Sequence, residues 1–293
     1  MKLAIIIPLF KGKVYISDLL ETIVNQTFTH ISIFAVDNNP EDGTAQELSI
    51  QAQKYSIDCQ IFPQPYNGGF AKAINIGLQK AIEQGFSHFV FLNQDVVLSS
   101  DVFEQGIHAL QNTMYGAVVP KILHIDNRIW WVGTHIFSAW RIVLSLSYKI
   151  SEHLSANQPY NEISDTIEEQ EIKPIEAITG CALFITKPVI EKVGYLDERY
   201  FMYGEDLDYS LRIKKAGYTL GLLTKPTVYH RDQYALGSKI LSDHIKSITK
   251  YRIYLTSCFV FLHTHYSLFV ALIWSVKLPI TLGYQYIAMK IKS

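Results

Sequence analysis

The sequence contains few of the features that mark disulfide-stabilised, zinc-binding or nucleic-acid-binding proteins. Its three cysteines, Cys59, Cys181 and Cys258, are far apart and none belongs to a CxxC pair. This spacing argues against a disulfide framework or a zinc site and favours a reducing compartment. Charged residues make up only 18% of the chain and the formal net charge is −1, so we expect no nucleic-acid partner.

Features of disordered, repetitive and secreted chains are missing as well. No internal repeat or low-complexity tract is present, and apolar residues make up 48% of the 293 residues, which predicts a folded core. The N-terminal sequence MKLAIIIPLFKG has a short apolar run, is interrupted by Pro8 and has no small-residue cleavage site. We therefore interpret it as a buried strand rather than a signal peptide.

Apolar residues in the first half of the chain alternate between strand-like runs and helical spacing. The runs lie at residues 3–9, 31–36, 61–62 and 89–92, and the helically spaced residues lie at 16–24 and 71–82. This order predicts an α/β fold with a mostly parallel sheet flanked by helices. Further strands are expected at 177–185 and 220–229, whereas the polar, aperiodic residues 141–174 predict a long surface loop or insertion.

Polar residues follow several of these strands, at the edge where ligands of such sheets bind. Asp37 in VDNNPEDGT is either a turn residue or a carboxylate that binds a base or ribose. Asn93 and Asp95 in FLNQDVVL, if extended, would point to one face and suit Mg²⁺ or Mn²⁺, although an acid at a loop start is the alternative. His230 ends a late strand and is either structural or a further metal ligand.

A glycine pair and an acid pair are the other candidate functional features. In YNGGFAKAINIG, Gly68 and Gly69 would let the backbone approach a ligand at a helix N-terminus, but neither a Walker loop nor GxGxxG is present. Glu205 and Asp206 are either acids stabilised by a helix dipole or include a catalytic base whose pKa is raised by its neighbours. Asp208 lies four residues before an arginine and predicts an ion pair within that helix.

These segments together resemble glycosyl transferase family 2, in its rhamnosyltransferase-like branch. The matching motifs are IIIPLF, VDNNPEDGT (with Pro40 where Ser is usual), NGGFAKAINIG, LNQDV, GCALFI and GYLDERYFMYGEDLDYSLR. The resemblance covers about residues 3–232. It implies a GT-A fold, a nucleoside-diphosphate sugar donor, a divalent cation (Mg²⁺ or Mn²⁺) and inversion at the anomeric carbon.

The resemblance also implies roles for individual residues. Asp206 would be the general base and Glu205 the less favoured candidate, while Asp95 and His230 would hold the metal. The donor would be bound by Pro8, Phe10, Asp37, Asn67, Gly69, Phe70, Asn75 and Asn93. The acceptor site would include Gly180 and Cys181, with the aromatic Trp130 and Tyr203 either stacking on a sugar or packing in the core.

The resemblance and the composition together suggest a division of the chain. Residues 1–235 would form the catalytic domain, with a nucleotide-sugar half at about 1–98 and an acceptor half at about 99–235, and residues 236–293 a helical C-terminal region. Residues 258–276 are apolar and would span a membrane, pack internally or, as we favour, lie in the membrane interface. Its basic neighbours, which would meet anionic headgroups, are Lys239, Lys246, Lys250, Arg252, Lys277, Lys290 and Lys292.

The expected function is therefore sugar transfer from a dTDP- or UDP-sugar to a saccharide or lipid-linked acceptor in bacterial surface polysaccharide synthesis. The enzyme would be peripheral on the cytoplasmic face of the plasma membrane. Rhamnose is the first expectation for the sugar, with UDP-linked galactose or galactofuranose behind it. A sugar-nucleotide pyrophosphorylase would need a Gly- and Arg-rich loop after the first strand, where only Gly12 occurs, and a non-catalytic sugar-nucleotide sensor is the other alternative.

Overall fold

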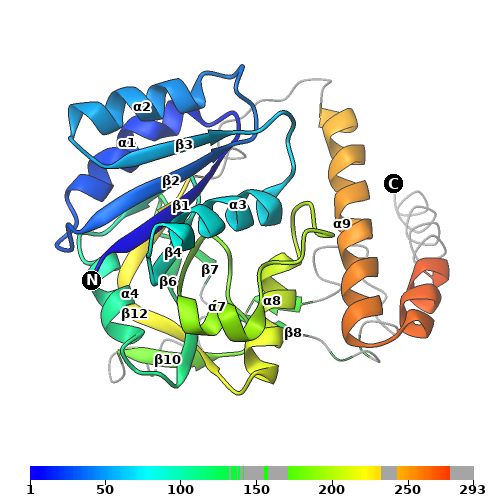
Figure 1. The fold of residues 1–293 in the computed structure, drawn as a ribbon. Helices are drawn as coiled ribbons and strands as arrows, with labels where there is room; N and C mark the ends of the chain where they lie inside the picture. The colour runs from blue at the N-terminus through cyan, green and yellow to red at the C-terminus, as the bar shows by residue number, and fades with distance from the viewer. Residues whose placement is uncertain are drawn as a thin grey trace.

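The structure is a computed structural model that describes residues 1–131, 133–136, 138, 141, 155–157, 171–231 and 243–277. Its centre is a ten-stranded mixed sheet flanked by helices (Figure 1), and eight of the strands follow the order β10-β12-β6-β11-β4-β1-β2-β3. The main strands are β1 (Leu3–Leu9), β2 (Ile31–Asp37), β3 (Cys59–Pro63), β4 (His88–Leu92), β6 (Tyr115–His124), β11 (Ala182–Thr186) and β12 (Thr219–His230). The predicted α/β class is confirmed.

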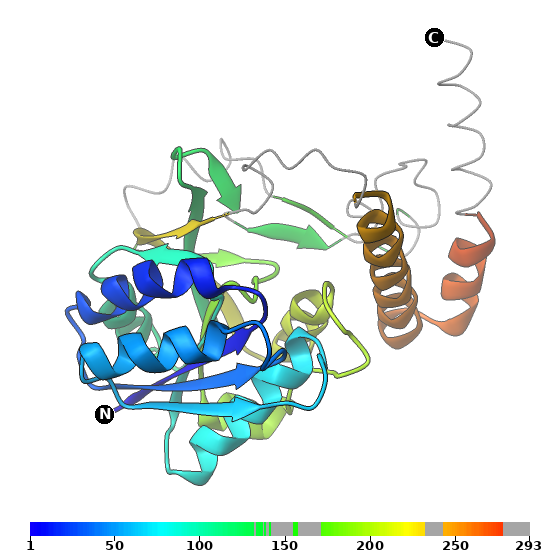
Figure 2. The same ribbon diagram turned by 90° about the horizontal axis from the view of Figure 1, so that it is seen from above.

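The first four strands are parallel and are joined by helices, as the apolar pattern predicts. β1 pairs in parallel with β2 on one side and with β4 on the other, and β2 pairs with β3. The connecting helices are α1 (Lys13–Val24), α2 (Thr44–Lys54) and α3 (Phe70–Glu83). Since the strand order reverses between β1 and β4, right-handed crossovers place α3 on the face of the sheet opposite α1 and α2 (Figures 1 and 2).

Helix α2 is the one element of this half that the apolar pattern does not predict. Its buried side chains, Thr44, Leu48 and Ala52, form a stripe only one residue wide along an otherwise polar helix. α1 buries four apolar side chains and α3 a broader face. A narrow stripe containing a threonine and an alanine gives too weak a periodic signal for a sequence prediction.

The second half adds antiparallel and mixed pairings to the same sheet. β11 runs antiparallel to β4 and β6, and β12 runs parallel to β6. The smaller strands and helices are β5 (Val96–Leu98), α4 (Val102–Ala109), β7 (Ile129–Trp131), α7 (Lys187–Val193) and α8 (Glu205–Lys215). The strand predicted at 177–185 begins at Ala182, because residues 179–181 form the turn that leads into it.

The segment expected to be a loop, residues 141–174, contains strand structure in its described part. β9 (Ser155–Asn157) pairs with β8 (Thr134–Ile136) in a separate two-stranded sheet, and β10 (Ile172–Ile175) joins the edge of the main sheet beside β12. Strands as short as these carry too few residues for a period to be visible. The rest of the segment lies outside the described residues.

The described part of the C-terminal region contains α9 (Asp243–His265) and helical residues 268–277, which lie beside the sheet next to α8 (Figures 1 and 2). Residues 258–276 are therefore divided between two helices. In the described part of the chain, no helix combines the length and apolar content needed to cross a membrane. The buried side chains of α9, including Cys258, Phe261 and Leu262, form a second core with Tyr200 and Leu207, so internal packing holds for this face.

Candidate active site

The sheet topology brings the predicted site residues to one edge. The carboxyl ends of β1 and β2 are in register through Leu9 and Asp37, and β4 ends at Leu92, opposite the start of β11 at Ala182. β12 ends at His230, which pairs with Val96 just after the β4 turn. The point where strand order reverses, between β1 and β4, is where open α/β sheets bind their ligands.

The loop after β1 and the turn after β4 are joined by Gln94. The Gln94 amide accepts a hydrogen bond from the Phe10 backbone N–H (3.1 Å) and donates one to the Phe10 carbonyl (2.6 Å). A Cβ at Gly12 would overlap the Gln94 amide, so a larger residue there would displace this side chain. Phe10, 39% exposed, is thereby held against the turn that contains Gln94 and Asp95, while Pro8 lies in β1. Gln94 was missed by the sequence analysis, although it lies inside the LNQDV motif.

Asn93, Asp95 and His230 converge, but not for the reason expected from the sequence. Residues 93–95 form a turn rather than an extended segment, so the expected strand alternation is wrong. The convergence comes from His230, whose Nε2 lies 3.4 Å from Asn93 Nδ2 and 3.6 Å from Asp95 Oδ1. The Trp130 ring stacks on His230 with centroids 4.6 Å apart, which places Trp130 beside the candidate metal ligands.

The donor set of Asp95 and His230 is compatible with a divalent cation. Among the described residues, no group of three or more His, Cys, Asp or Glu side chains is arranged to hold a metal. Mg²⁺ and Mn²⁺ in phosphate-binding sites take one or two protein ligands and complete their coordination with phosphate oxygens and water. A carboxylate and an imidazole 3.6 Å apart therefore fit such an ion.

The asparagines after β2 and β3 shape the loops beside Asp37. Asp37 is buried and accepts a hydrogen bond from the Asn39 N–H (3.0 Å); burial raises its pKa. Asn38 donates to the Gly69 carbonyl and accepts from the Gly68 N–H, both at 3.4 Å. Asn67 accepts from the Gly69 N–H at 2.9 Å. Asn38, which the sequence analysis did not select, thus ties the two loops together.

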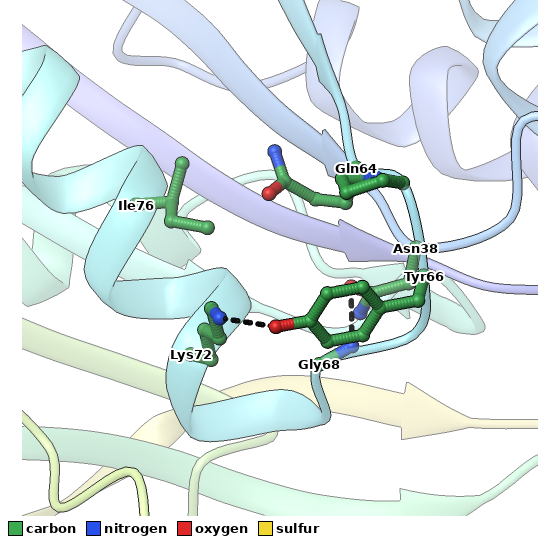
Figure 3. Close-up of a pocket in the computed structure, with 7 residues that line it drawn as sticks. Asn38, Gln64, Tyr66, Gly68, Lys72 and Ile76 are labelled. Atoms are coloured by element: carbon green, nitrogen blue, oxygen red, sulfur yellow. Dashed lines mark hydrogen bonds between the residues drawn. The ribbon is translucent and has the colours of Figure 1, made fainter.

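A pocket of roughly 320 Å³ lies on the α3 side of these loops and is lined in part by Asn38, Gln64 and Ile76 (Figure 3). Lys72 Nζ donates to the Tyr66 hydroxyl at 3.0 Å across this pocket. Because Asn38 follows Asp37 directly, the pocket adjoins the predicted base and ribose site.

The N-terminus of α3 is occupied by the protein itself. The Phe70 N–H donates to the Phe201 carbonyl at 2.8 Å, and Gly69 has φ +88° with no room for a Cβ beside that carbonyl. Gly69 was expected to let the backbone approach a ligand at the helix N-terminus. In the structure the group that approaches Gly69 is instead the Phe201 carbonyl. The Phe70 ring instead lies against Gly180, where an added Cβ would approach it to 2.9 Å.

Asn75 supports the loop before the acid pair. Its amide donates to the Leu196 carbonyl (2.9 Å) and to Glu198 (3.0 Å) and accepts from the Leu196 N–H (3.0 Å). These contacts tie α3 to residues 196–198, so the buried Asn75 stabilises the loop that leads to the acid pair. Its predicted contact with nucleotide or sugar stays a prediction.

The acid pair begins α8; the Glu205 side chain is buried, whereas Asp206 is partly exposed. Gly204, at φ +92°, precedes the helix, and Glu205 and Asp206 form its first turn. Burial, followed by the charge of Asp206, raises the pKa of Glu205 to about 8. Burial also raises the pKa of Asp206 to about 6, although backbone N–H groups, including those of Leu207 and Gly180, favour its ionised form. The pair therefore holds one proton near neutral pH, mainly on Glu205.

The ion pair predicted in α8 is confirmed. Arg212 Nη2 lies 2.7 Å from Asp208 Oδ2, with Asp208 fully buried. The other oxygen of Asp208 lies 2.7 Å from His265 Nε2 of α9. Asp208 therefore fixes α8 to α9, and both of its carboxylate oxygens are used in these structural contacts.

Gly180 and Cys181 connect the acid pair to the candidate metal ligands. The Gly180 N–H faces the Asp206 carboxylate, and the Cys181 carbonyl accepts from the Asn93 N–H at 3.0 Å. Only Gly180 and Cys181 thus lie between the expected base, Asp206, and the turn that carries the expected metal ligand Asp95. Tyr203, three residues before Asp206, stacks on Tyr254 of α9 with centroids 4.2 Å apart. The structure brings these residues to one edge of the sheet, while the cysteine itself is buried and needs no reactivity.

Comparison with known proteins agrees with this arrangement. The family model described as glycosyl transferase family 2 matches residues 4–183. The chain is 25% identical over 233 residues to an N-acetylglucosaminyl-diphospho-decaprenol L-rhamnosyltransferase of Mycobacterium tuberculosis, covering 74% of this chain and 73% of the relative. It is 23% identical over 246 residues to rhamnosyltransferase WbbL of Escherichia coli, covering 81% and 87%.

Solved structures show the same fold. GalNAc-T7 with UDP, GalNAc and Mn²⁺ superposes with a TM-score of 0.63 at 16% identity, covering 79% of this chain and 44% of the other. Staphylococcus aureus TarS 1–349 with UDP superposes with a TM-score of 0.54 at 13% identity, covering 88% and 65%. The chain thus spans less than half of the first of these solved chains. The predicted GT-A fold is confirmed, and the chain belongs to glycosyl transferase family 2, in its rhamnosyltransferase-like branch.

Proposed function

We propose that this glycosyltransferase moves a sugar from a nucleoside diphosphate to a hydroxyl of a saccharide or lipid-linked acceptor, with inversion at the anomeric carbon. One observation carries the proposal. Gly180 and Cys181 connect the carboxyl pair at 205–206 to the candidate metal ligands. The Gly180 N–H faces the Asp206 carboxylate, and the Cys181 carbonyl accepts a hydrogen bond from the N–H of Asn93, whose side chain lies 3.4 Å from His230. A proton acceptor and a set of diphosphate-binding groups so close together suit a single displacement at the carbon between them.

In the proposed reaction Asp206 accepts the proton of the acceptor hydroxyl. The oxygen forms a bond to the anomeric carbon while the bond from that carbon to the diphosphate oxygen breaks. Attack from the side opposite the leaving group inverts the configuration. Glu205, protonated near neutral pH because burial raises its pKa to about 8, keeps the pair at one negative charge and leaves Asp206 as the base. General-base catalysis of this kind contributes roughly 10²- to 10⁴-fold.

Asp95 and His230 would hold a divalent cation, with Asn93 beside them. Such an ion would neutralise the charge that develops on the departing diphosphate. The backbone of the 10–12 loop, fastened to the 93–95 turn by Gln94, would keep the nucleotide in register with these ligands. Asp37, buried at the end of β2, would accept hydrogen bonds from the base or ribose.

The comparisons support a choice of substrates. Two relatives are named as rhamnosyltransferases, one of them for a diphospho-decaprenol acceptor, and the solved neighbours contain UDP or UDP-GlcNAc. We propose dTDP-rhamnose as donor, with a UDP-sugar as the alternative, and a polyprenol-diphosphate saccharide of surface polysaccharide synthesis as acceptor.

We also propose that the C-terminal helices lie in the interface of the plasma membrane, on its cytoplasmic face. Helical residues 268–277 bury Ala271 and Trp274 against the second core. The opposite side exposes large apolar side chains, namely Leu268, Phe269, Leu272 and Val276. Residues 236–293 contain seven Lys or Arg and one acid, a balance that favours anionic headgroups.

The test is an assay of the full chain with Mn²⁺ or Mg²⁺ and three donors: dTDP-rhamnose, UDP-galactose and UDP-galactofuranose. The acceptor is a synthetic N-acetylglucosaminyl diphosphate carrying a short polyprenyl chain. We expect a disaccharide lipid with inverted configuration by NMR and no product with EDTA. Thermal stabilisation by nucleotide without transfer from any donor would instead favour a sugar-nucleotide sensor.

A further inference from the structure

Helix α9 holds the loop that leads into the acid pair. The residues that make these contacts recur at helical spacing on one face of α9. Ser257 Oγ donates to the Met202 carbonyl at 3.1 Å, and Thr264 Oγ1 accepts from Arg199 at 3.0 Å. The Tyr254 ring lies flat on Tyr203, with planes 6° apart. On its other side the loop is bound to α3, because the Phe201 carbonyl accepts from the Phe70 N–H.

The conformation of Tyr203 shows that the loop depends on these contacts. Tyr203 has φ +70°, a left-handed conformation that a bulky L-residue adopts only when its surroundings impose it. Gly204, the next residue, is also left-handed, at φ +92°. Two consecutive left-handed residues turn the chain sharply into the first turn of α8. The ring stack with Tyr254 is one contact that retains the Tyr203 side chain in this turn, and a hydrogen bond between the two side chains is another.

We propose that α9 is a working part of the active site and that Tyr254 is a positioning residue, which holds the turn at 203–204 and thereby aims the Asp206 carboxylate at the acceptor hydroxyl. This inference rests on the proposed function of Asp206 as the base. It assigns to the C-terminal region a role in catalysis that is separate from its proposed attachment to a lipid surface.

Two further observations place Tyr254 close enough to act in this way. Burial raises the pKa of Tyr254, and the charges of Tyr203 and Asp206 contribute to the rise, so the phenol lies within electrostatic reach of the carboxylate. At the C-terminal end of α9, eleven residues after Tyr254, His265 Nε2 lies 2.7 Å from the buried Asp208 of α8. α9 is therefore fixed to the helix of the acid pair at one point and to the preceding turn at another.

The test compares Tyr254→Ala and Tyr254→Leu with Tyr254→Phe in the full chain. Tyr254→Leu keeps apolar volume without a ring, and serves if the alanine variant does not fold. Phe259→Ala is the matched control, because Phe259 is a partly buried ring of the same helix whose ring contact is with His263. For each variant we would measure kcat and its pH profile, calorimetric Kd values for UDP and dTDP with Mn²⁺, and amide exchange of residues 199–206.

We expect Tyr254→Ala and Tyr254→Leu to lower kcat by about 10- to 100-fold, the range expected when a reacting group is displaced by about 1 Å. Nucleotide Kd should change much less than kcat, since the 199–206 loop meets the donor-binding residues only where the Phe201 carbonyl accepts from the Phe70 N–H and lies against Gly69. Amide exchange at 199–206 should accelerate, and the midpoint of the rising limb of the pH profile should fall as water reaches Asp206. Tyr254→Phe keeps the stack but removes the hydrogen bond between the Tyr254 and Tyr203 side chains, and it should retain kcat and amide exchange much closer to wild type than Tyr254→Ala or Tyr254→Leu.

The inference is overturned if the loop exchanges as slowly in Tyr254→Ala or Tyr254→Leu as in Phe259→Ala. It is also overturned if exchange accelerates while kcat and the pH profile stay at wild-type values. If the wild-type chain transfers no sugar, the proposed function fails, and amide exchange alone then decides whether Tyr254 holds the turn.

Discussion

The two neighbouring carboxyl groups at the start of α8 should respond very differently to amide substitution. Burial raises the pKa of Glu205 to about 8 and that of Asp206 to about 6. At pH 7 Asp206 is therefore the more ionised of the two carboxyl groups, and Glu205 holds the proton that the pair shares. Glu205→Gln therefore imitates the state that Glu205 already occupies, whereas Asp206→Asn removes the only carboxylate able to accept a proton.

We accordingly expect Asp206→Asn to lower kcat by about 10²- to 10⁴-fold and Glu205→Gln by less than about tenfold at pH 7. In the wild type, kcat should rise with pH through a midpoint near 6, as Asp206 ionises. The assay is transfer at saturating donor and acceptor between pH 5 and 9. Nucleotide Kd is measured in parallel, so that loss of binding is distinguished from loss of the base.

The same pair should make stability depend on pH. Both folded pKa values lie above the ordinary carboxyl values, so the stabilising contribution is fully present below about pH 4 and is lost as pH rises through 6 and then 8. Because Gln cannot ionise, Glu205→Gln should be clearly more stable than wild type at pH 9, with little difference at pH 5. Full activity of Asp206→Asn, or a Glu205→Gln variant as inactive as we expect Asp206→Asn to be, would refute these assignments.

Three other perturbations test separate parts of the structure. In a denaturant titration, Gly69→Ala should destabilise the fold by about 3 kcal/mol or more, because a left-handed φ is combined with overlap of the Phe201 carbonyl. Gly85→Ala, at a left-handed residue with open space around it, should cost only about 1 kcal/mol. Equal losses of stability in the two variants would contradict the contact between Gly69 and Phe201. Asp95→Asn and His230→Ala should each abolish most of the extra thermal stabilisation that Mn²⁺ gives to the protein bound to UDP or dTDP, while the melting temperature without nucleotide changes little. If the metal-dependent stabilisation is unchanged in these variants, Asp95 and His230 are not the metal ligands. A Phe269→Glu and Leu272→Glu double variant of the full chain should no longer co-sediment with anionic vesicles. The control Ile50→Glu, at a similarly exposed apolar side chain on α2, should still co-sediment. Co-sedimentation of both the double variant and the control would argue against the proposed interfacial face.

Several features of the fold and site could be predicted from the sequence for identifiable physical reasons. The apolar runs of β1, β2 and β4 are buried on both faces, so they are continuous and easily recognised. Polar residues that end such strands must meet at one edge, and the register of Leu9 with Asp37 shows this directly. The Asp208–Arg212 pair follows from helical spacing alone.

Features set by contacts between distant segments could not be predicted. The pattern N-x-G is consistent with a phosphate-binding helix start, but the neighbour of Gly69 is the carbonyl of Phe201, more than a hundred residues later. Asn93 and Asp95 converge through His230 rather than through strand alternation. Nothing local indicates that Tyr254, outside the family motifs, packs on Tyr203.

The most direct test is a crystal structure of the full chain with Mn²⁺ and an uncleaved donor bound to the Asp206→Asn variant. The account predicts a metal ion held by Asp95 and His230, bridging the diphosphate. It also predicts the anomeric carbon about 6 Å or less from the side chain at position 206, on the face opposite the leaving oxygen, which is room for one acceptor hydroxyl. A donor whose anomeric carbon faces away from position 206, or a diphosphate bound away from Asp95 and His230, would contradict it.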